Sequence, residues 1–368
     1  MKIKKKPTFF SGKSSVLIRI IKQFFLIFGI LTGSTLLLVI VSLLFLSRSY
    51  TPKIKGANSI ASLEKVNLGG IKQTILIRSQ DTANPILLFL HGGPGSPLMP
   101  FAYVSDRKLE EKFIVVHWDQ RGAGKSYTKN TNRADLTIEH YLSDTHALIH
   151  HLCERFGKEK VFLLGHSWGS YLGIITASRH PELLHAYIGM GQVVNMPVGE
   201  TISYDYVLEK ARAANDRKAI RDLERIGPPP YDDHKELLAE RNWLTSYQGL
   251  IHNRSLFKTV TDALVSPEYS IWDHINEFEA RDFSLSCIWA DFQKVSIEET
   301  ITALEVPVYF LEGRYDYCVP SELVEQYVNR LQAPYKELIW FEKSAHMINI
   351  EETSLYQDVL ISKVLTSK

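Results

Sequence analysis

The 368-residue sequence has few cysteines, no internal repeat and no low-complexity tract, and its formal net charge is only +1. The three cysteines, Cys153, Cys287 and Cys318, are odd in number and far apart, which fits neither a disulfide framework nor a cysteine-rich metal site. Hydrophobic residues make up 45% of the chain and charged residues 23%. This balance excludes an intrinsically disordered protein, and the chain is long enough to bury a full hydrophobic core.

Acidic residues are absent from positions 1–50, where the sequence has eight Lys or Arg residues. The rest of the chain therefore has 34 basic and 41 acidic residues, a net charge of −7. A body with this charge lacks the basic surface that nucleic-acid binding requires. We expect no nucleic-acid partner.

Charges of either sign are also absent from the 23 residues between Phe24 and Leu46. As a helix, this stretch would extend roughly 34 Å and cross a hydrocarbon core of about 30 Å. Residues 24–46 are therefore predicted to form a transmembrane helix whose partner is the lipid bilayer. Seven Lys or Arg residues precede the span and three follow it closely. The positive-inside rule then predicts a cytoplasmic basic segment at 1–23 and an extracytoplasmic body.

The same stretch has two alternative interpretations, a cleaved signal peptide and a buried core helix. The apolar region of a signal peptide usually has about 7–15 residues, and Ser47-Arg48-Ser49 is a poor cleavage site. We therefore predict an uncleaved, single-pass anchor in the cell membrane.

Beyond a linker at 47–61, the sequence predicts an α/β fold. Residues 62–79 alternate in polarity around Gly69-Gly70, as in an antiparallel hairpin. Short apolar runs then recur, each followed by turn residues or a helical stretch, which is typical of a mostly parallel sheet with helices on both faces. These runs are Ile86–Leu90, Phe113–His117, Val161–Leu164, Ala186–Met190, Val308–Leu311 and Glu337–Phe341. The most regular helix is predicted over Ile138–Phe156, ended by Gly157.

The strand pattern stops between residues 195 and 304. There the composition is mixed and rich in Tyr, Trp and charged residues, and Gly227-Pro228-Pro229-Pro230 interrupts it. The sequence therefore predicts a helical cap at 195–304, inserted into a core formed by 62–194 and 305–368.

Ser167 lies in the pentapeptide Gly165-His-Ser-Trp-Gly169, directly after a predicted strand and before a helical stretch. A strand, a sharp turn and a helix are the context that the G-x-S-x-G motif requires, because the turn lifts the serine hydroxyl above the edge of the sheet. Ser167 is therefore the predicted nucleophile.

A serine nucleophile needs a base and an acid that orients the base, and in this architecture they follow in the order Ser, acid, His. Asp316 comes just after the predicted strand Val308–Leu311, and His346 comes a few residues after the next strand. We predict Asp316 as the acid and His346 as the base. Glu312 is the alternative acid, although its position at the strand end favours a side chain directed into the sheet.

Backbone N–H groups that stabilise an oxyanion are expected in the glycine-rich segment LFLHGGPGS, which begins within the strand Ile86–Leu90 and continues after it. The predicted oxyanion hole consists of the N–H groups of Gly93 and Trp168. His91 is expected to brace this loop rather than to titrate in catalysis.

Two further patterns suggest cofactor or metal chemistry but lack necessary residues. The GAGKS sequence at 122–126 has Asp119 where a phosphate-binding loop requires glycine. His146 and His150 are four residues apart on a predicted helix, but Ala147 occupies the position of the zinc-protease glutamate. We therefore expect no cofactor and no metal.

Five motifs together resemble the α/β-hydrolase fold, and specifically the proline iminopeptidase family. They are HGGPG at 91–95, WDQRGAGKS at 118–126, GHSWGS at 165–170, GRYD at 313–316 and AH at 345–346. The resemblance extends from about Ile86 to the C-terminus and weakens through 195–304. It implies Ser167, Asp316 and His346 as nucleophile, acid and base beneath a helical cap. Aminopeptidases of this family hold the substrate's α-amino group with cap glutamates, which no motif places here, and they are typically soluble and cytoplasmic.

The sequence thus predicts a membrane-anchored serine hydrolase that acts through an acyl-enzyme, and the resemblance implies an aminopeptidase for short peptides. A carboxylesterase for small esters and a catalytically silent binding module are the alternatives. An aminopeptidase must hold an ammonium group near Ser167. The segment that leaves the strand Ala186–Met190 begins at the same sheet edge, and Glu200 and Asp205 are its first carboxylates. Glu200 is the first candidate for this substrate-binding role.

Overall fold

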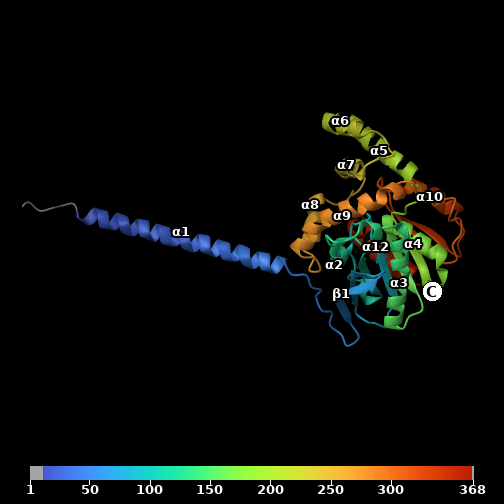
Figure 1. The fold of residues 1–368 in the computed structure, drawn as a ribbon, viewed down its shortest axis with the longest axis horizontal. Coiled ribbons are helices and arrows are strands. Elements are labelled where there is room, and N and C mark those ends of the chain that lie inside the picture. The colour runs from blue at the N-terminus through green and yellow to red at the C-terminus, as the bar shows by residue number, and fades with distance from the viewer. Residues whose placement is uncertain (1–10, 367–368) are drawn as a thin grey trace, which may run out of the picture. The chain divides into compact units, whose positions relative to one another are not determined.

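The computed structural model describes residues 11–366, and the chain divides into two compact units, Met1–Arg48 and Ser49–Lys368 (Figure 1). The first unit contains one long helix, α1 (Ser11–Leu46). In the described part of the chain, α1 is the one helix long and apolar enough to cross a membrane, with a mean hydropathy of 1.7 over Ile21–Leu38. Its length and composition fit a membrane anchor or a signal sequence.

The helix α1 begins 13 residues before the predicted span, so part of the predicted basic segment is helical. The remaining basic residues of that segment, Lys2, Lys4, Lys5 and Lys6, lie outside the described residues.

The second unit is an α/β fold, as predicted. Within residues 60–341 the strands form one sheet in the order β1-β2-β4-β3-β5-β6-β7-β8. They are β1 (Ile60–Leu68), β2 (Ile71–Ser79), β3 (Ile86–Leu90), β4 (Ile114–Asp119), β5 (Val161–His166), β6 (Leu184–Met190), β7 (Val308–Gly313) and β8 (Lys336–Phe341). β1 pairs antiparallel with β2, and β2 pairs antiparallel with β4. The other neighbours are parallel.

The predicted hairpin around Gly69-Gly70 is present, and it begins two residues earlier than expected. Ile60 pairs with Ser79 across the hairpin, so the last two residues of the predicted linker belong to β1.

Alternate side chains of the buried strands face opposite sides of the sheet, which explains their continuous apolar runs. In β3, Leu88 packs in one hydrophobic cluster, with α3 (Ile138–Phe156), α4 (Trp168–Arg179) and α10 (Ser321–Arg330). The neighbouring Leu87 packs in a second cluster, which includes α12 (Thr353–Val359). The sheet therefore has helices on both faces. Two shorter helices, α2 (Ala102–Ser105) and α11 (Ile348–Glu351), lie in the loops after β3 and β8.

The helix α3 has the predicted bounds because both of its ends are capped. The Thr137 side chain accepts a hydrogen bond from the His140 N–H at 3.3 Å. At the other end, Gly157 adopts a left-handed conformation with φ +61°, which glycine tolerates best.

The insertion between β6 and β7 is helical, as the mixed composition predicts. Its helices are α5 (Met196–Ala213), α6 (Arg217–Ile226), α7 (His234–Ser246), α8 (Leu256–Leu264) and α9 (Ile271–Phe292). The break at Gly227 and the three prolines follows the end of α6. Figure 1 shows α9 lying across one end of the sheet, with α5, α6 and α7 beyond it.

Candidate active site

Ser167 lies alone between the end of β5 and the start of α4, with φ +55° and ψ −121°. Such a strained backbone is rare outside glycine and is typical of functional turns. The flanking glycines are needed because a Cβ at Gly165 would lie 2.3 Å from the Gly169 oxygen, and a Cβ at Gly169 would lie 2.1 Å from the Leu90 oxygen. The predicted strand, sharp turn and helix are therefore confirmed.

His346 and Asp316 lie in hydrogen-bond contact, with 2.7 Å between Nδ1 and Oδ2, and both side chains are buried. The other carboxylate oxygen of Asp316 accepts the N–H groups of Cys318 and Val319, each at 2.9 Å. Burial alone would lower the pKa of His346, but the charge of Asp316 raises it well above the usual value. Asp316 is therefore placed to stabilise the imidazolium that forms when His346 accepts a proton.

The predicted nucleophile and base line one cleft of about 280 Å³, together with Gly93 and Cys318. The alternative acid, Glu312, is also buried, but it does not line this cleft. Its carboxylate accepts the Gln192 N–H at 2.9 Å, and burial together with the nearby Asp316 raises its pKa well above the usual value. Glu312 and His346 share no hydrogen bond among the described residues.

The loops that hold the acid and the base are both bonded to one segment of the helical insertion. The Tyr317 N–H donates to the Gly249 carbonyl at 3.0 Å, and the His346 N–H donates to the Leu250 carbonyl at 3.1 Å. This segment follows α7, so the insertion helps to fix the positions of Asp316 and His346.

The backbone N–H groups of Gly93 and Trp168 have no protein acceptor among the described residues. Two backbone donors without a protein acceptor beside a strained serine fit a site for an oxyanion. The structure places both residues where the sequence predicts them, Gly93 in the loop after β3 and Trp168 at the start of α4.

Gln120, which sequence reasoning did not select, links the two sides of this site. Its side chain accepts the Trp168 indole N–H and donates to the His91 carbonyl, both at 3.0 Å. Its backbone N–H donates to Nε2 of His91 at 3.1 Å, so the proton of that ring lies on Nδ1 and is donated to the Gly92 carbonyl. Burial lowers the pKa of His91 to about 4. These contacts confirm His91 as a neutral brace.

Glu200 is buried on α5 and pairs with Arg241 of α7, with 2.5 Å between Oε1 and Nη2. The same guanidinium contacts Glu240, and the Ser203 hydroxyl donates to Glu240 at 2.9 Å. When both carboxyl groups are ionised, this cluster of Glu200, Glu240 and Arg241 has a net charge of −1. No sequence signal identifies Glu240 or Arg241, because charged residues in a helical stretch usually face solvent.

A second, smaller cavity of about 60 Å³ is lined by both Ser167 and Glu200. Its walls combine apolar side chains with the Arg241 guanidinium, and the apolar residues are Val193, Met196, Leu237, Trp289, Phe292 and Val319. The Oε2 atom of Glu200 is buried and has no hydrogen-bond partner among the described residues. Burial raises the pKa of Glu200 to about 7; Arg241 opposes the rise and Glu240 adds to it.

The GAGKS turn and the two histidines of α3 both make contacts within the protein. In the GAGKS turn, Lys125 pairs with Asp273 of α9 at 2.5 Å, and the Ser126 hydroxyl donates to the Asp119 carbonyl. His146 and His150 contact each other along α3, with 3.2 Å between their Nε2 atoms.

Comparisons with known proteins agree with this fold. Residues 85–225 match the α/β hydrolase fold family. A Bacillus subtilis (strain 168) protein named probable aminopeptidase YbaC is 35% identical over 306 residues, covering 82% of this chain and 96% of that protein. A proline iminopeptidase of Saccharolobus solfataricus is 26% identical over 289 residues, covering 76% of this chain and 84% of the relative.

The crystal structure of a Mycobacterium smegmatis proline iminopeptidase has the same fold, with a TM-score of 0.58 and 19% identity over 83% of this chain and 98% of that one. On the identity and coverage of its relatives, the chain belongs to the α/β-hydrolase superfamily and is an enzyme that resembles the proline iminopeptidases.

Proposed function

We propose that the protein is a membrane-anchored serine aminopeptidase that removes N-terminal residues from short peptides. Ser167 attacks the carbonyl carbon while His346 takes the hydroxyl proton, which it then gives to the leaving amine. Asp316 holds the imidazole in the required tautomer. The N–H groups of Gly93 and Trp168 stabilise the oxyanion. A water molecule, activated by His346 as the base, then hydrolyses the acyl-enzyme.

The unpaired carboxylate oxygen of Glu200 is the observation that carries the peptide assignment. In an aminopeptidase the substrate ammonium is only two bonds from the carbonyl carbon, so its partner must lie beside the nucleophile. Glu200 and Ser167 line the same small cavity, and the Glu200, Glu240 and Arg241 cluster has a net charge of −1. This anion is needed because an unpaired buried charge costs several kcal/mol.

The same proposal includes residues 195–304 as the cap over the site and α1 as the uncleaved anchor. The N-terminus would be cytoplasmic and the catalytic unit extracytoplasmic, as the charges beside the span predict. The aminopeptidase names of the relatives support a peptide substrate.

The amine-binding role is tested with Glu200→Gln and, as a control, with Asp205→Asn, an exposed residue of the same helix. kcat/KM is measured for a peptide with a free N-terminus, its N-acetylated form and a neutral ester. Glu200→Gln should lose roughly 2–4 kcal/mol of transition-state stabilisation on the free amine alone, as expected for a truncated charge pair. Equal losses on all three substrates would make Glu200 structural. A wild-type preference for the acetylated peptide or the ester would favour the carboxylesterase alternative.

The nucleophile is tested separately with Ser167→Ala. This variant should remain folded and no longer react with a fluorophosphonate probe. Labelling at the wild-type rate would contradict the assignment, and an unlabelled wild-type protein would favour a catalytically silent binding module.

A further inference from the structure

Two helices of the insertion expose an unusual number of large apolar side chains to solvent. We call this surface the α8–α9 apolar face, and its residues are Leu256, Phe257, Val260, Leu264, Val265, Trp272, Ile275 and Phe278. Phe257 is 80% exposed and Phe278 is 70% exposed. The members on α8 fall within about 100° of the helix circumference, so they form one side of the helix. Contiguous exposed apolar surface marks a site that contacts a partner or a membrane.

The start of the second unit is bonded to the loop that joins these two helices. The Tyr50 N–H donates to the Pro267 carbonyl at 2.8 Å, and the Thr51 hydroxyl donates to Glu268 at 3.0 Å. Arg78 of β2 donates to the Pro52 carbonyl at 2.8 Å, which fixes the same segment from the other side. The chain that follows the anchor therefore runs directly beside the α8–α9 apolar face.

Only Ser47, Arg48 and Ser49 separate the end of α1 from Tyr50. Four residue steps span at most about 14 Å of extended chain. If α1 crosses a bilayer, the loop between α8 and α9 must lie close to the surface of that bilayer. A protein partner or a second copy would have to compete with the membrane for this position.

We propose that the α8–α9 apolar face inserts into the surface of the bilayer that holds α1. Amphipathic helices bind in this way with their apolar side about 5–10 Å into the headgroup and acyl boundary. Trp272 is suited to that boundary because indole combines an apolar ring with a polar N–H. The inference rests on the membrane anchoring in the proposed function and is independent of the catalytic roles.

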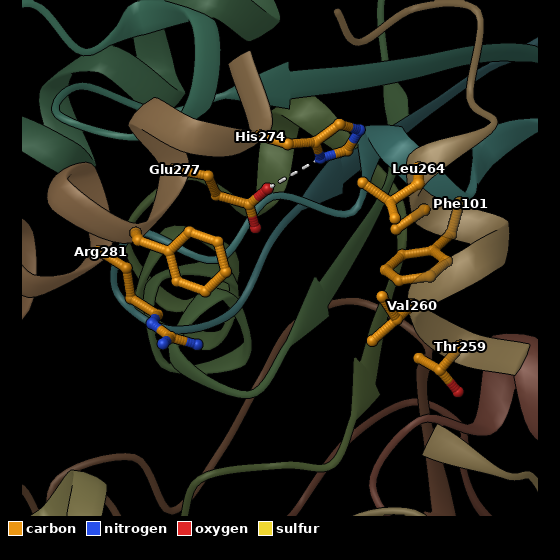
Figure 2. Close-up of a pocket in the computed structure, with 9 residues that line it drawn as sticks. Phe101, Thr259, Val260, Leu264, His274, Glu277 and Arg281 are labelled. Carbon is orange, nitrogen blue, oxygen red and sulfur yellow. Dashed lines mark ion pairs between the residues drawn. The ribbon is translucent and has the colours of Figure 1, made fainter. Parts of the chain in front are cut away.

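A cavity of about 190 Å³ opens on this face and gives the docking a consequence for the substrate. Figure 2 shows the cavity walls, with Phe101, Val260 and Leu264 on one side and His274, Glu277 and Arg281 on the other. Phe101, Glu277 and Arg281 also line the cleft that contains Ser167. The cleft and the cavity are therefore neighbours, so in this proposal a peptide with apolar side chains approaches Ser167 from the membrane side.

The test uses the full chain in phosphatidylcholine vesicles with brominated acyl chains, which quench nearby tryptophan fluorescence. All six tryptophans lie beyond the anchor, and those other than Trp272 are buried or half-buried. The brominated lipids should quench part of the tryptophan emission of the wild type. This quenched part should be absent in Trp272→Phe. The control Trp243→Phe loses emission but should keep the quenched fraction.

A second variant, Phe257→Asp with Val265→Asp, changes two exposed residues that line neither cavity. It should lose most of the bromine quenching while its kcat/KM on a soluble substrate stays within about twofold, since nothing in the cleft is altered. Equal quenching of wild type and Trp272→Phe would overturn the proposal. In that case, crosslinking of two copies through this face would show that it is a contact between chains. The same vesicles are also washed with carbonate and pelleted. A chain that α1 anchors stays in the vesicle pellet, whereas an unanchored chain is released, so this wash tests the anchor separately from the apolar face.

Discussion

At the scale of single residues, the two carboxylate oxygens of Asp316 have different partners. One oxygen accepts two backbone N–H groups of its own loop, and the other faces Nδ1 of His346. The first contact fixes the carboxylate, so the second can fix the tautomer and orientation of the imidazole.

Replacing Asp316 with Asn is expected to lower kcat by about 10⁴-fold, because an amide favours the wrong imidazole tautomer. The carboxylate also raises the pKa of His346, so its removal should move the acid limb of the kcat/KM profile to lower pH. The measurement is a pH profile of both enzymes with one substrate. An acid limb that does not move would show that Asp316 does not act on His346.

If Glu200 binds the substrate amine, the pH dependence of KM should differ between substrates with and without a free amine. Its pKa of about 7 means that the carboxyl becomes neutral as the pH falls through that value, and the net charge of its cluster then changes from −1 to zero. KM for a free-amine peptide should therefore rise between about pH 8 and pH 6, while KM for a neutral ester stays flat. In Glu200→Gln the rise should disappear. If KM has the same pH profile for both substrates, Glu200 does not bind the substrate amine.

At the scale of secondary-structure elements, Gln120 ties the loop after β3 to the start of α4. Gln120→Ala should lower kcat by about 10–100-fold with little change in KM, because small displacements of an oxyanion donor weaken only the transition state. The fluorophosphonate labelling rate should fall in parallel. Asn130→Ala, at an exposed position of the same loop region, is the matched control. A rise in KM with unchanged kcat would contradict this positioning role.

The elements themselves could be predicted from the sequence because their signals are local. The continuous apolar runs give β3 to β8 to within a few residues, and Gly157 marks the end of α3. The Glu200 contact could not be predicted, because its partner Arg241 lies 41 residues away on another helix. The role of Gln120 is likewise set by contacts with His91 and Trp168, which only the fold brings together.

At the scale of the whole molecule, if α1 is a membrane anchor, its orientation decides which compartment contains the second unit. A protease added to intact cells should digest the chain after Tyr50 and leave a short membrane-protected fragment with the N-terminus. Epitope tags at the two ends, detected by immunoblot, distinguish the products. Complete protection until lysis would mean the reverse orientation, and a soluble protein without its N-terminal tag would mean that the segment is a cleaved signal sequence.

The bonds from Gly249 and Leu250 to the loops that contain Asp316 and His346 have a consequence for protein engineering. Exchanging caps between relatives is an obvious route to new specificity, but here the segment after α7 supplies the carbonyl groups that hold both loops. A chimera joined only at residues 195 and 304 would replace those carbonyls together with Glu200 and Arg241. A successful exchange would keep Gly249 and Leu250 from this chain and graft the surrounding helices in two separate pieces.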